Sequence, residues 1–151
     1  MRVSARADYA IRALLELAAA PGGNVRAEAI ARAQAIPPKF LENVLGDLRR
    51  AKLVASQRGT DGGYRLARPA AGITLADVIR AVEGPLADVR DLAPEDLAYT
   101  GPATSLREVW VALRAGMRAV LEAVTVADVA SGRLPASVRK LLATPDAWTR
   151  R

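Results

Sequence analysis

One stretch in the first third of the chain carries side chains whose chemistry suits a nucleic acid. If residues 38–51 form a helix, their polar positions fall opposite the apolar ones. Lys, Asn and Glu carry donors and acceptors that match the edges of base pairs, and arginines suit phosphates. A charged helix face is more often merely solvated, so its interpretation depends on its neighbours. The polar positions are Lys39, Glu42, Asn43, Gly46, Arg49 and Arg50.

A second stretch follows directly and is rich in arginine and glycine. Two strand-like runs, 53–57 and 64–67, flank residues 58–63, where glycines accept the positive φ of a tight turn. A hairpin tip with Arg58 beside glycines can lie on the sugar–phosphate backbone and insert its guanidinium into a narrow minor groove. The glycines make a turn in any case, and DNA contact is an additional role. The DNA-binding candidates are Lys39, Glu42, Asn43, Arg49, Arg50, Gln57, Arg58, Thr60, Gly62, Gly63, Tyr64 and Arg65.

The residue types exclude many kinds of site. The chain has no cysteine and no histidine, which excludes disulfides, thiol nucleophiles, structural zinc and imidazole acid–base chemistry. No phosphate-loop Gly-Lys-Ser/Thr and no Gly-x-Gly-x-x-Gly motif occurs. Ser137 and Lys140 have a spacing seen in some acyl-transfer enzymes, although such short matches are common by chance. We nominate no catalytic residue, no metal ligand and no cofactor.

Charge is segregated along the 151 residues, whose net charge is +6. Residues 1–70 have a net charge of +6, residues 71–100 of −4 and residues 101–151 of +4. A basic first half suits a polyanionic partner. No run of 18 apolar residues occurs, and the start lacks the apolar core of a signal peptide. We therefore expect a soluble, cytoplasmic protein without membrane contact.

The elements that must position these stretches follow from hydrophobic periodicity. Helices are expected at 5–20, 25–34 and 38–51, with Ser4 and Asn24 as N-caps of the first two. Two helices joined by a brief turn predict a helix-turn-helix, and a hairpin directly after it predicts a wing. The apolar stripes are Ile11, Leu14, Leu15 and Ala18 in the first helix and Leu41, Val44, Leu45 and Leu48 in the third.

The second half is expected to hold one long helix behind an acidic loop. Thr74 opens a fourth helix with a capping-box variant, and Ser105 with Glu108 opens the longest helix, 105–124, with a full capping box. Residues 85–104 have no period, and we expect a solvated loop. Its acids lack the spacing of a calcium site; they are Asp88, Asp91, Glu95 and Asp96.

The long helix has a continuous apolar side, which favours burial against a second copy of the chain. Trp110 and Met117 are hypothesised to border a pocket for a small-molecule effector at that seam. Shorter helices are expected after Thr125 and Pro135. The dimerisation candidates are Leu106, Val109, Trp110, Leu113, Met117, Val120, Leu121 and Val124.

The predicted fold is mainly α with a small β-hairpin. It consists of a winged helix-turn-helix domain at 1–84, the acidic loop at 85–104, and a dimerisation helix with a C-terminal tail at 105–151.

Four motifs in this order resemble the Rrf-two family of bacterial winged-helix transcription regulators, which includes IscR, NsrR and CymR. They span roughly residues 1–130 and begin at positions 9, 36, 58 and 73: Tyr-Ala-Ile-Arg-Ala-Leu, Ile-Pro-Pro-Lys-Phe-Leu-Glu, Arg-Gly-Thr-Asp-Gly-Gly-Tyr-Arg-Leu and Ile-Thr-Leu-Ala-Asp-Val-Ile. The resemblance implies a dimeric, operator-binding regulator with its third helix in the major groove and its wing in the minor groove. Glu42 would then be the recognition-helix acid linked to sequence choice, and Arg58 the wing arginine.

The chain departs from the family where the cluster-binding branches place three cysteines. Those branches carry them between the fourth helix and the long helix, where this sequence runs from Val89 to Thr100, with Thr104 near the last position. An iron–sulfur cluster on the chain's own Cys or His is excluded, and so is a cysteine redox switch. The leading hypothesis is a homodimeric regulator that reads a palindrome. The alternatives are a non-specific architectural module that binds DNA or protein, and a serine–lysine hydrolase.

Overall fold

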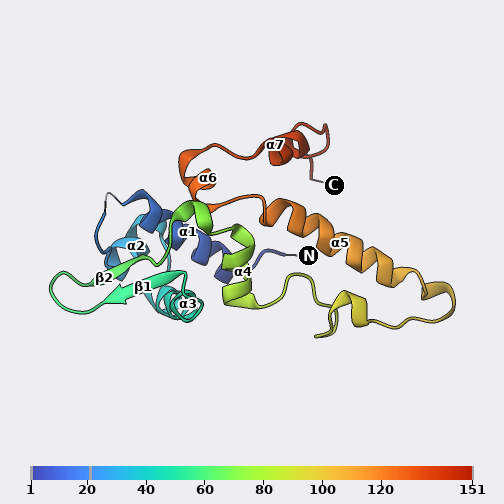
Figure 1. Cartoon of the computed structure of the whole chain (residues 1–151), viewed down its shortest axis with the longest axis horizontal. Coiled ribbons are helices and arrows are strands. Elements are labelled where there is room, and N and C mark those ends of the chain that lie inside the picture. The colour runs from blue at the N-terminus through green and yellow to red at the C-terminus, as the bar shows by residue number, and fades with distance from the viewer. Residues whose placement is uncertain (1, 21, 151) are drawn as a thin grey trace.

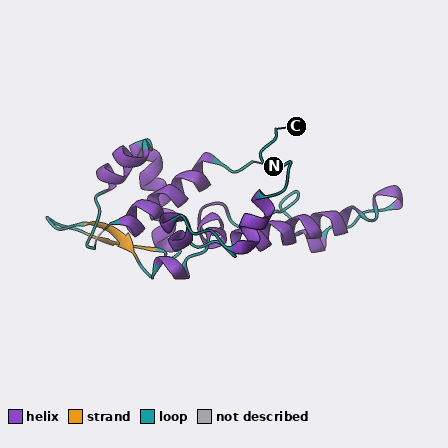
Figure 2. Cartoon of the chain, turned by 90° about the horizontal axis from the view of Figure 1, so that it is seen from above, coloured by secondary structure: helices purple, strands orange, loops and turns teal. Residues whose placement is uncertain are grey.

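The computed structural model describes residues 2–20 and 22–150, and the chain is mainly helical with one antiparallel hairpin, as predicted. The hairpin lies at one end of an elongated molecule, and the helix α5 extends toward the other end (Figures 1 and 2). No helix in these ranges is long and apolar enough to span a bilayer. The helices and strands are α1 Ala5–Ala19, α2 Ala27–Gln34, α3 Pro38–Arg50, β1 Val54–Gln57, β2 Gly63–Leu66, α4 Leu75–Glu83, α5 Leu106–Leu121, α6 Val126–Ser131 and α7 Ala136–Leu142.

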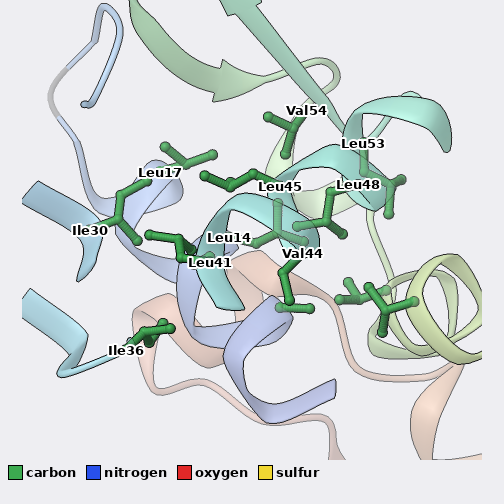
Figure 3. Packing of buried hydrophobic residues seen from close by; sticks show 14 of the residues in the cluster. Leu14, Leu17, Ile30, Ile36, Leu41, Val44, Leu45, Leu48, Leu53 and Val54 are labelled. Atoms are coloured by element: carbon green, nitrogen blue, oxygen red, sulfur yellow. The ribbon is translucent and has the colours of Figure 1, made fainter. Parts of the chain in front are cut away.

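One core rich in leucine holds α1, α3 and α4 together. Leu14 and Ile30 from α1 and α2 lie against the stripe of α3 (Figure 3). The predicted stripe of α3 is confirmed, because all four of its members are buried. In α1 the predicted stripe is only partly correct, since Ile11, Leu15 and Ala18 are half-buried. Alanines on the buried side let the neighbouring helices approach closely. The buried residues of α1 are Ala7, Ala10, Ala13, Leu14 and Leu17.

The hairpin is fixed to the core at its base and has a glycine-dependent tip. β1 and β2 pair antiparallel from Val54 opposite Leu66 to Gln57 opposite Gly63. A Cβ on Gly62 would lie 2.6 Å from the Gln57 carbonyl oxygen, which no side chain tolerates. Gly63 has a φ of +141°, which also favours glycine. The predicted glycine turn is therefore confirmed, and we call residues 58–62 the wing tip.

The segment between α1 and α2 pairs with the hairpin. Val25 and Tyr64 form an antiparallel bridge, with N···O distances of 2.8 Å in both directions. The bridge keeps the backbone extended through Arg26, so α2 begins at Ala27. The prediction that Asn24 caps this helix is therefore wrong.

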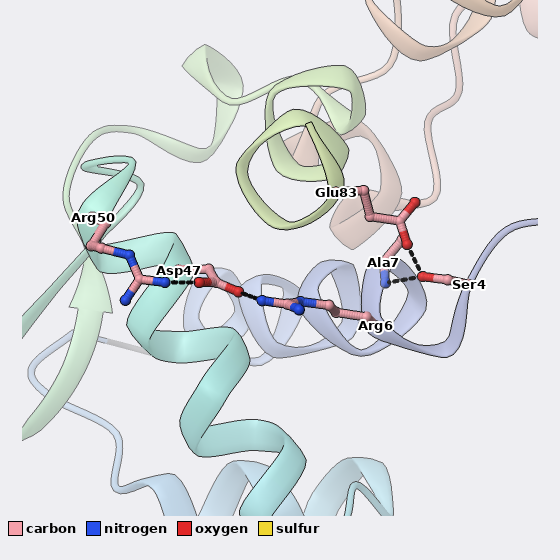
Figure 4. A network of polar contacts seen from close by, with 6 residues as sticks. All are labelled: Ser4, Arg6, Ala7, Asp47, Arg50 and Glu83. Carbon is pink, nitrogen blue, oxygen red and sulfur yellow. Dashed lines mark hydrogen bonds and ion pairs between the residues drawn. The ribbon is translucent and has the colours of Figure 1, made fainter. Parts of the chain in front are cut away.

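Capping residues fix where three of the helices start. Ser4 caps α1 as predicted and donates a hydrogen bond to Glu83 of α4 (Figure 4). Thr74 and Asp77 form the predicted capping box at α4, and Thr125 with Asp128 forms another at α6. Thr74 and Thr125 also form an antiparallel bridge, so these two caps lie side by side. This bridge joins α6 to the body of the molecule.

The long helix α5 has no buried residue of its own within the described chain. It ends at Leu121, and Val124, predicted to belong to its apolar side, lies beyond it and is only 3% exposed. The Val124 carbonyl accepts a hydrogen bond from the Leu75 N–H at 2.9 Å, so Val124 packs in the body of the single chain. The predicted capping box at Ser105 is also wrong. Its backbone is already helical, with φ −78° and ψ −1°, whereas a capping residue needs an extended backbone.

Residues 85–104 are more ordered than the sequence predicts. Short 3₁₀ turns form at Pro94–Asp96 and Gly101–Ala103. Leu86, Pro94 and Leu97 are buried, although they follow no regular period. The segment lies along α5 (Figure 1) and is therefore a packed connection rather than a solvated loop.

Candidate nucleic-acid interface

The outer face of α3 presents the predicted polar residues to solvent. Lys39 and Glu42 are exposed and form an ion pair, with Lys39 Nζ 3.6 Å from Glu42 Oε2. Asn43 is exposed next to Glu42 in the chain. Gly46 lies one turn further along, and a Cβ there would meet only Arg50 Nη1, at 3.6 Å. The middle of this face therefore leaves the helix backbone uncovered.

Arg50 is held by a buried carboxylate on α3. Asp47 is 6% exposed, and its carboxylate pairs with both Arg50 and Arg6 of α1 (Figure 4). A buried carboxylate is costly when no opposite charge compensates it, and both arginines reach Asp47 from positions that are themselves partly exposed. The two arginines therefore compensate Asp47, and the pair with Arg6 joins α3 to α1. A DNA phosphate would have to compete with Asp47 for Arg50.

α3 and the wing border one groove of about 520 Å³. Glu42 and Arg49 line it from α3, and Gln57, Arg58 and Tyr64 line it from the hairpin. Arg58 is exposed and has no hydrogen-bond or ion-pair partner among the described residues. Its guanidinium is available to an external anion.

The groove unites only part of the predicted set. Its lining contains Glu42, Arg49, Gln57, Arg58, Gly62, Gly63 and Tyr64. The predicted residues outside the lining are Lys39, Asn43, Arg50, Thr60 and Arg65. Arg65 donates to the side chain of Asn24 at 3.2 Å and so has a partner within the chain.

Sequence reasoning missed the contribution of the segment before α2. Arg26 and Glu28 line the same groove, together with Ser56 and Gly59 of the hairpin. Arg26 enters because Val25 pairs with Tyr64, a contact between positions far apart in the sequence. One local signal was available. Asn24, Val25 and Arg26 alternate between polar and apolar, which is typical of a short strand.

The apolar side of α5 is only partly covered in the single chain. Its half-buried members are Leu106, Trp110, Met117, Val120 and Leu121. Val109, Val111 and Leu113 are exposed, although valine and leucine usually avoid water. A largely apolar groove of about 690 Å³ separates α5 from the body. Trp110 and Met117, the predicted borders of an effector pocket, both line an adjoining groove.

The segment before α5 holds no set of metal ligands. Within residues 2–20 and 22–150, no three His, Cys, Asp or Glu side chains are grouped so that they could bind a metal. Glu95 pairs with Arg114 at 2.6 Å, and this hydrogen bond lowers the pKa of Glu95 below its ordinary value. Because the chain also has no Cys and no His, it lacks the usual ligands of an iron–sulfur cluster.

Residues 3–132 match the model of the Rrf2 family, described as iron-dependent transcriptional regulators. The ligand chemistry of this chain does not support the iron dependence in that description. A candidate HTH-type transcriptional regulator of Mycobacterium tuberculosis is 54% identical over 142 residues, which cover 93% of this chain and 88% of that protein. The HTH-type transcriptional regulator CymR of Bacillus subtilis is 36% identical over 132 residues, covering 87% and 91%.

Solved structures are similar as well. The structure of B. subtilis CymR, described as the global cysteine regulator of that organism, has a TM-score of 0.72 and 34% identity, covering 87% of this chain and 98% of that one. The structure of IscR from T. potens has a TM-score of 0.71 and 32% identity, covering 87% and 88%. The family and these relatives are regulators and not enzymes, which sets aside the hydrolase alternative at Ser137 and Lys140. The chain belongs to the Rrf2 family of winged-helix, DNA-binding transcriptional regulators.

Proposed function

We propose that the chain acts in the cytoplasm as a homodimer that recognises a palindromic operator by its sequence. The observation that carries this proposal is the groove with the polar face of α3 on one side and the free Arg58 of the wing on the other. A major groove admits an α-helix, and a narrow minor groove attracts arginine. In this arrangement Glu42 and Asn43 contact base edges, and Arg58 enters the neighbouring minor groove.

Selection of bound duplexes from a random library tests sequence recognition. We expect an enriched palindrome whose half-sites lie about one helical turn, roughly 34 Å, apart. A non-specific architectural module would enrich no sequence and would lose any one duplex to excess random DNA, whereas a sequence reader retains its operator. Absence of an enriched sequence would contradict the proposal.

Two substitutions test the roles of α3 and the wing. Arg58→Ala should lower affinity about tenfold or more, in line with the 1–3 kcal/mol typical of a lost arginine contact. Arg139→Ala on α7 makes the same change in net charge outside the groove and should leave affinity unchanged. Glu42→Ala should relax base preference in the selected site. Unchanged footprints and affinities in both site variants would remove this assignment.

The exposed apolar residues of α5, Val109 and Leu113, support a homodimer. In helix seams, apolar residues of one copy pack between those of the other, and small residues at 112, 115 and 116 permit close approach. Val109 and Leu141 are both 53% exposed in the single chain, the first on α5 and the second on α7. We expect Val109→Asp to yield monomers in sedimentation experiments and Leu141→Asp to remain dimeric. A dimeric Val109→Asp variant would place the interface elsewhere.

We further propose that operator binding requires no cluster held by the chain's own Cys or His, because it has neither. Affinity for the selected duplex should be the same with and without an iron chelator. A loss of binding on chelation would show that iron reaches this protein through other ligands.

A further inference from the structure

The side chain of Asn24, which lies before α2, forms three hydrogen bonds with the hairpin. Its Nδ2 donates to the carbonyl oxygen of Asp61 at 2.9 Å and to Oε1 of Gln57 at 3.1 Å. Its Oδ1 accepts from Nη1 of Arg65 at 3.2 Å. One amide therefore contacts both strands and the wing tip, although it lies more than thirty residues earlier in the chain.

The two residues that follow Asn24 also bind the hairpin, one through its side chain and one through its backbone. Arg26 Nη2 donates to the carbonyl oxygen of Thr60 at 2.7 Å, and Val25 forms its bridge with Tyr64. At Gly63 the approach is so close that a Cβ would lie 2.6 Å from the Val25 carbonyl oxygen. The segment 24–26 therefore follows the hairpin closely from the strands to the tip.

This attachment matters because a two-stranded hairpin is only marginally stable by itself. The wing tip contains two glycines, Gly59 and Gly62, and its residues 58–61 are exposed. If the tip were mobile, DNA binding would have to order it, and that ordering reduces affinity. Hydrogen bonds from Asn24 and Arg26 to the carbonyl oxygens of Asp61 and Thr60 restrain the tip in the chain without DNA.

We propose that Asn24 is a positioning residue for DNA binding: it holds the wing tip so that Arg58 is presented to the minor groove without prior ordering. The inference rests on the proposed function. Asn24 acts through the wing and contacts no DNA. Its effect therefore depends on the presence of the Arg58 guanidinium.

A double-mutant cycle on a duplex enriched from the random library tests this dependence. Asn24→Ala removes three side-chain hydrogen bonds and should lower affinity about tenfold. In an Arg58→Ala background the same substitution should lower affinity by less than about twofold. Equal losses in both backgrounds would mean that Asn24 acts on DNA independently of Arg58, and would overturn the proposal.

Amide exchange in the free protein tests the attachment without DNA. In Asn24→Ala the Gly62 amide, which donates to the Gly59 carbonyl oxygen at 2.9 Å, should exchange faster, while the core amide of Leu45 should not change. Ser131→Ala, which removes a side-chain hydrogen bond on α6, should alter neither exchange in the wing nor DNA affinity. Unchanged exchange at Gly62 would overturn the proposal. Full affinity of Arg58→Ala would contradict the proposed function of the wing, while the exchange result would still report on the attachment.

Discussion

Gly46 gives a direct test of how closely α3 approaches DNA. Glycine inside a helix is less favourable than alanine by about 1 kcal/mol. The free protein has no steric need for it, because an added Cβ would meet only Arg50 Nη1 at 3.6 Å, an ordinary van der Waals distance. Gly46→Ala should therefore stabilise the free protein by about 0.5–1 kcal/mol. In a domain of this size each kcal/mol corresponds to a rise of about 2–4 °C in Tm.

The same methyl group should weaken operator binding. It stands on the polar face of α3, one turn from Glu42 and Asn43, and keeps the helix backbone away from the base edges. A good base contact contributes about 1–3 kcal/mol of discrimination. Losing one such contact lowers affinity for the operator about tenfold or more, whereas affinity for random DNA should change less. Stability and affinity should thus move in opposite directions.

Thermal melting by circular dichroism and fluorescence anisotropy with the selected duplex measure the two effects. Gly72→Ala serves as the control, because an added Cβ at this surface turn would meet nothing within 4 Å and lies outside the groove. It should leave operator affinity unchanged. If Gly46→Ala raises Tm but binds the operator normally, α3 does not approach DNA at Gly46. A lowered Tm would refute the argument from helix propensity.

Three further substitutions and measurements follow from the contacts described. Gly63→Ala should detach the hairpin from Val25 and accelerate amide exchange at Tyr64, because its Cβ would lie 2.6 Å from a carbonyl oxygen. Gly59→Ala should not, since Gly59 also has a positive φ, of +99°, but has open space where its Cβ would lie. Arg114→Ala should raise the pKa of Glu95 toward 4.5 in an NMR titration, since the hydrogen bond from Arg114 is the main cause of its lowering. The stability that this pair contributes is present above the pKa of Glu95 in the unfolded chain. It is lost as the pH falls through the lower pKa of the folded chain. An effector at the seam should change Trp110 fluorescence in a Trp148→Phe background, and a metabolite screen without any change in fluorescence or Tm would contradict that hypothesis.

Local patterns were sufficient to predict the stripe of α3, the cap of α4 and the turn of the wing. The stripe of α3 follows a helical period and is buried as predicted, and Thr74 caps α4 through a box that is readable from four consecutive residues. The glycines of the wing tip are likewise explained by a turn. In each case the residues that define the element lie within one or two turns of each other, so short-range chemistry decides the outcome.

Contacts between distant segments account for the errors. Asn24 looks like a helix cap, but Val25 pairs with Tyr64 and Asn24 bonds the hairpin instead. No local pattern predicts a role for Asp47: Arg6 approaches it from α1 and its carboxylate is buried. Neither Tyr64 nor Arg6 is marked as a partner by spacing in the sequence, since each contact depends on how distant segments come together. The same argument applies to the groove lining, where Arg26 enters through the Val25 bridge.

The chain belongs to a family described as iron-dependent, but its residues 85–104 contain no cysteine or histidine to bind an iron–sulfur cluster. Instead, Tyr99 accepts a hydrogen bond from Trp110 Nε1 at 3.1 Å, and Glu95 pairs with Arg114. Both partners belong to α5, the helix of the proposed seam. Because these contacts join the segment to α5, we expect a ligand that displaces α5 to displace this segment too.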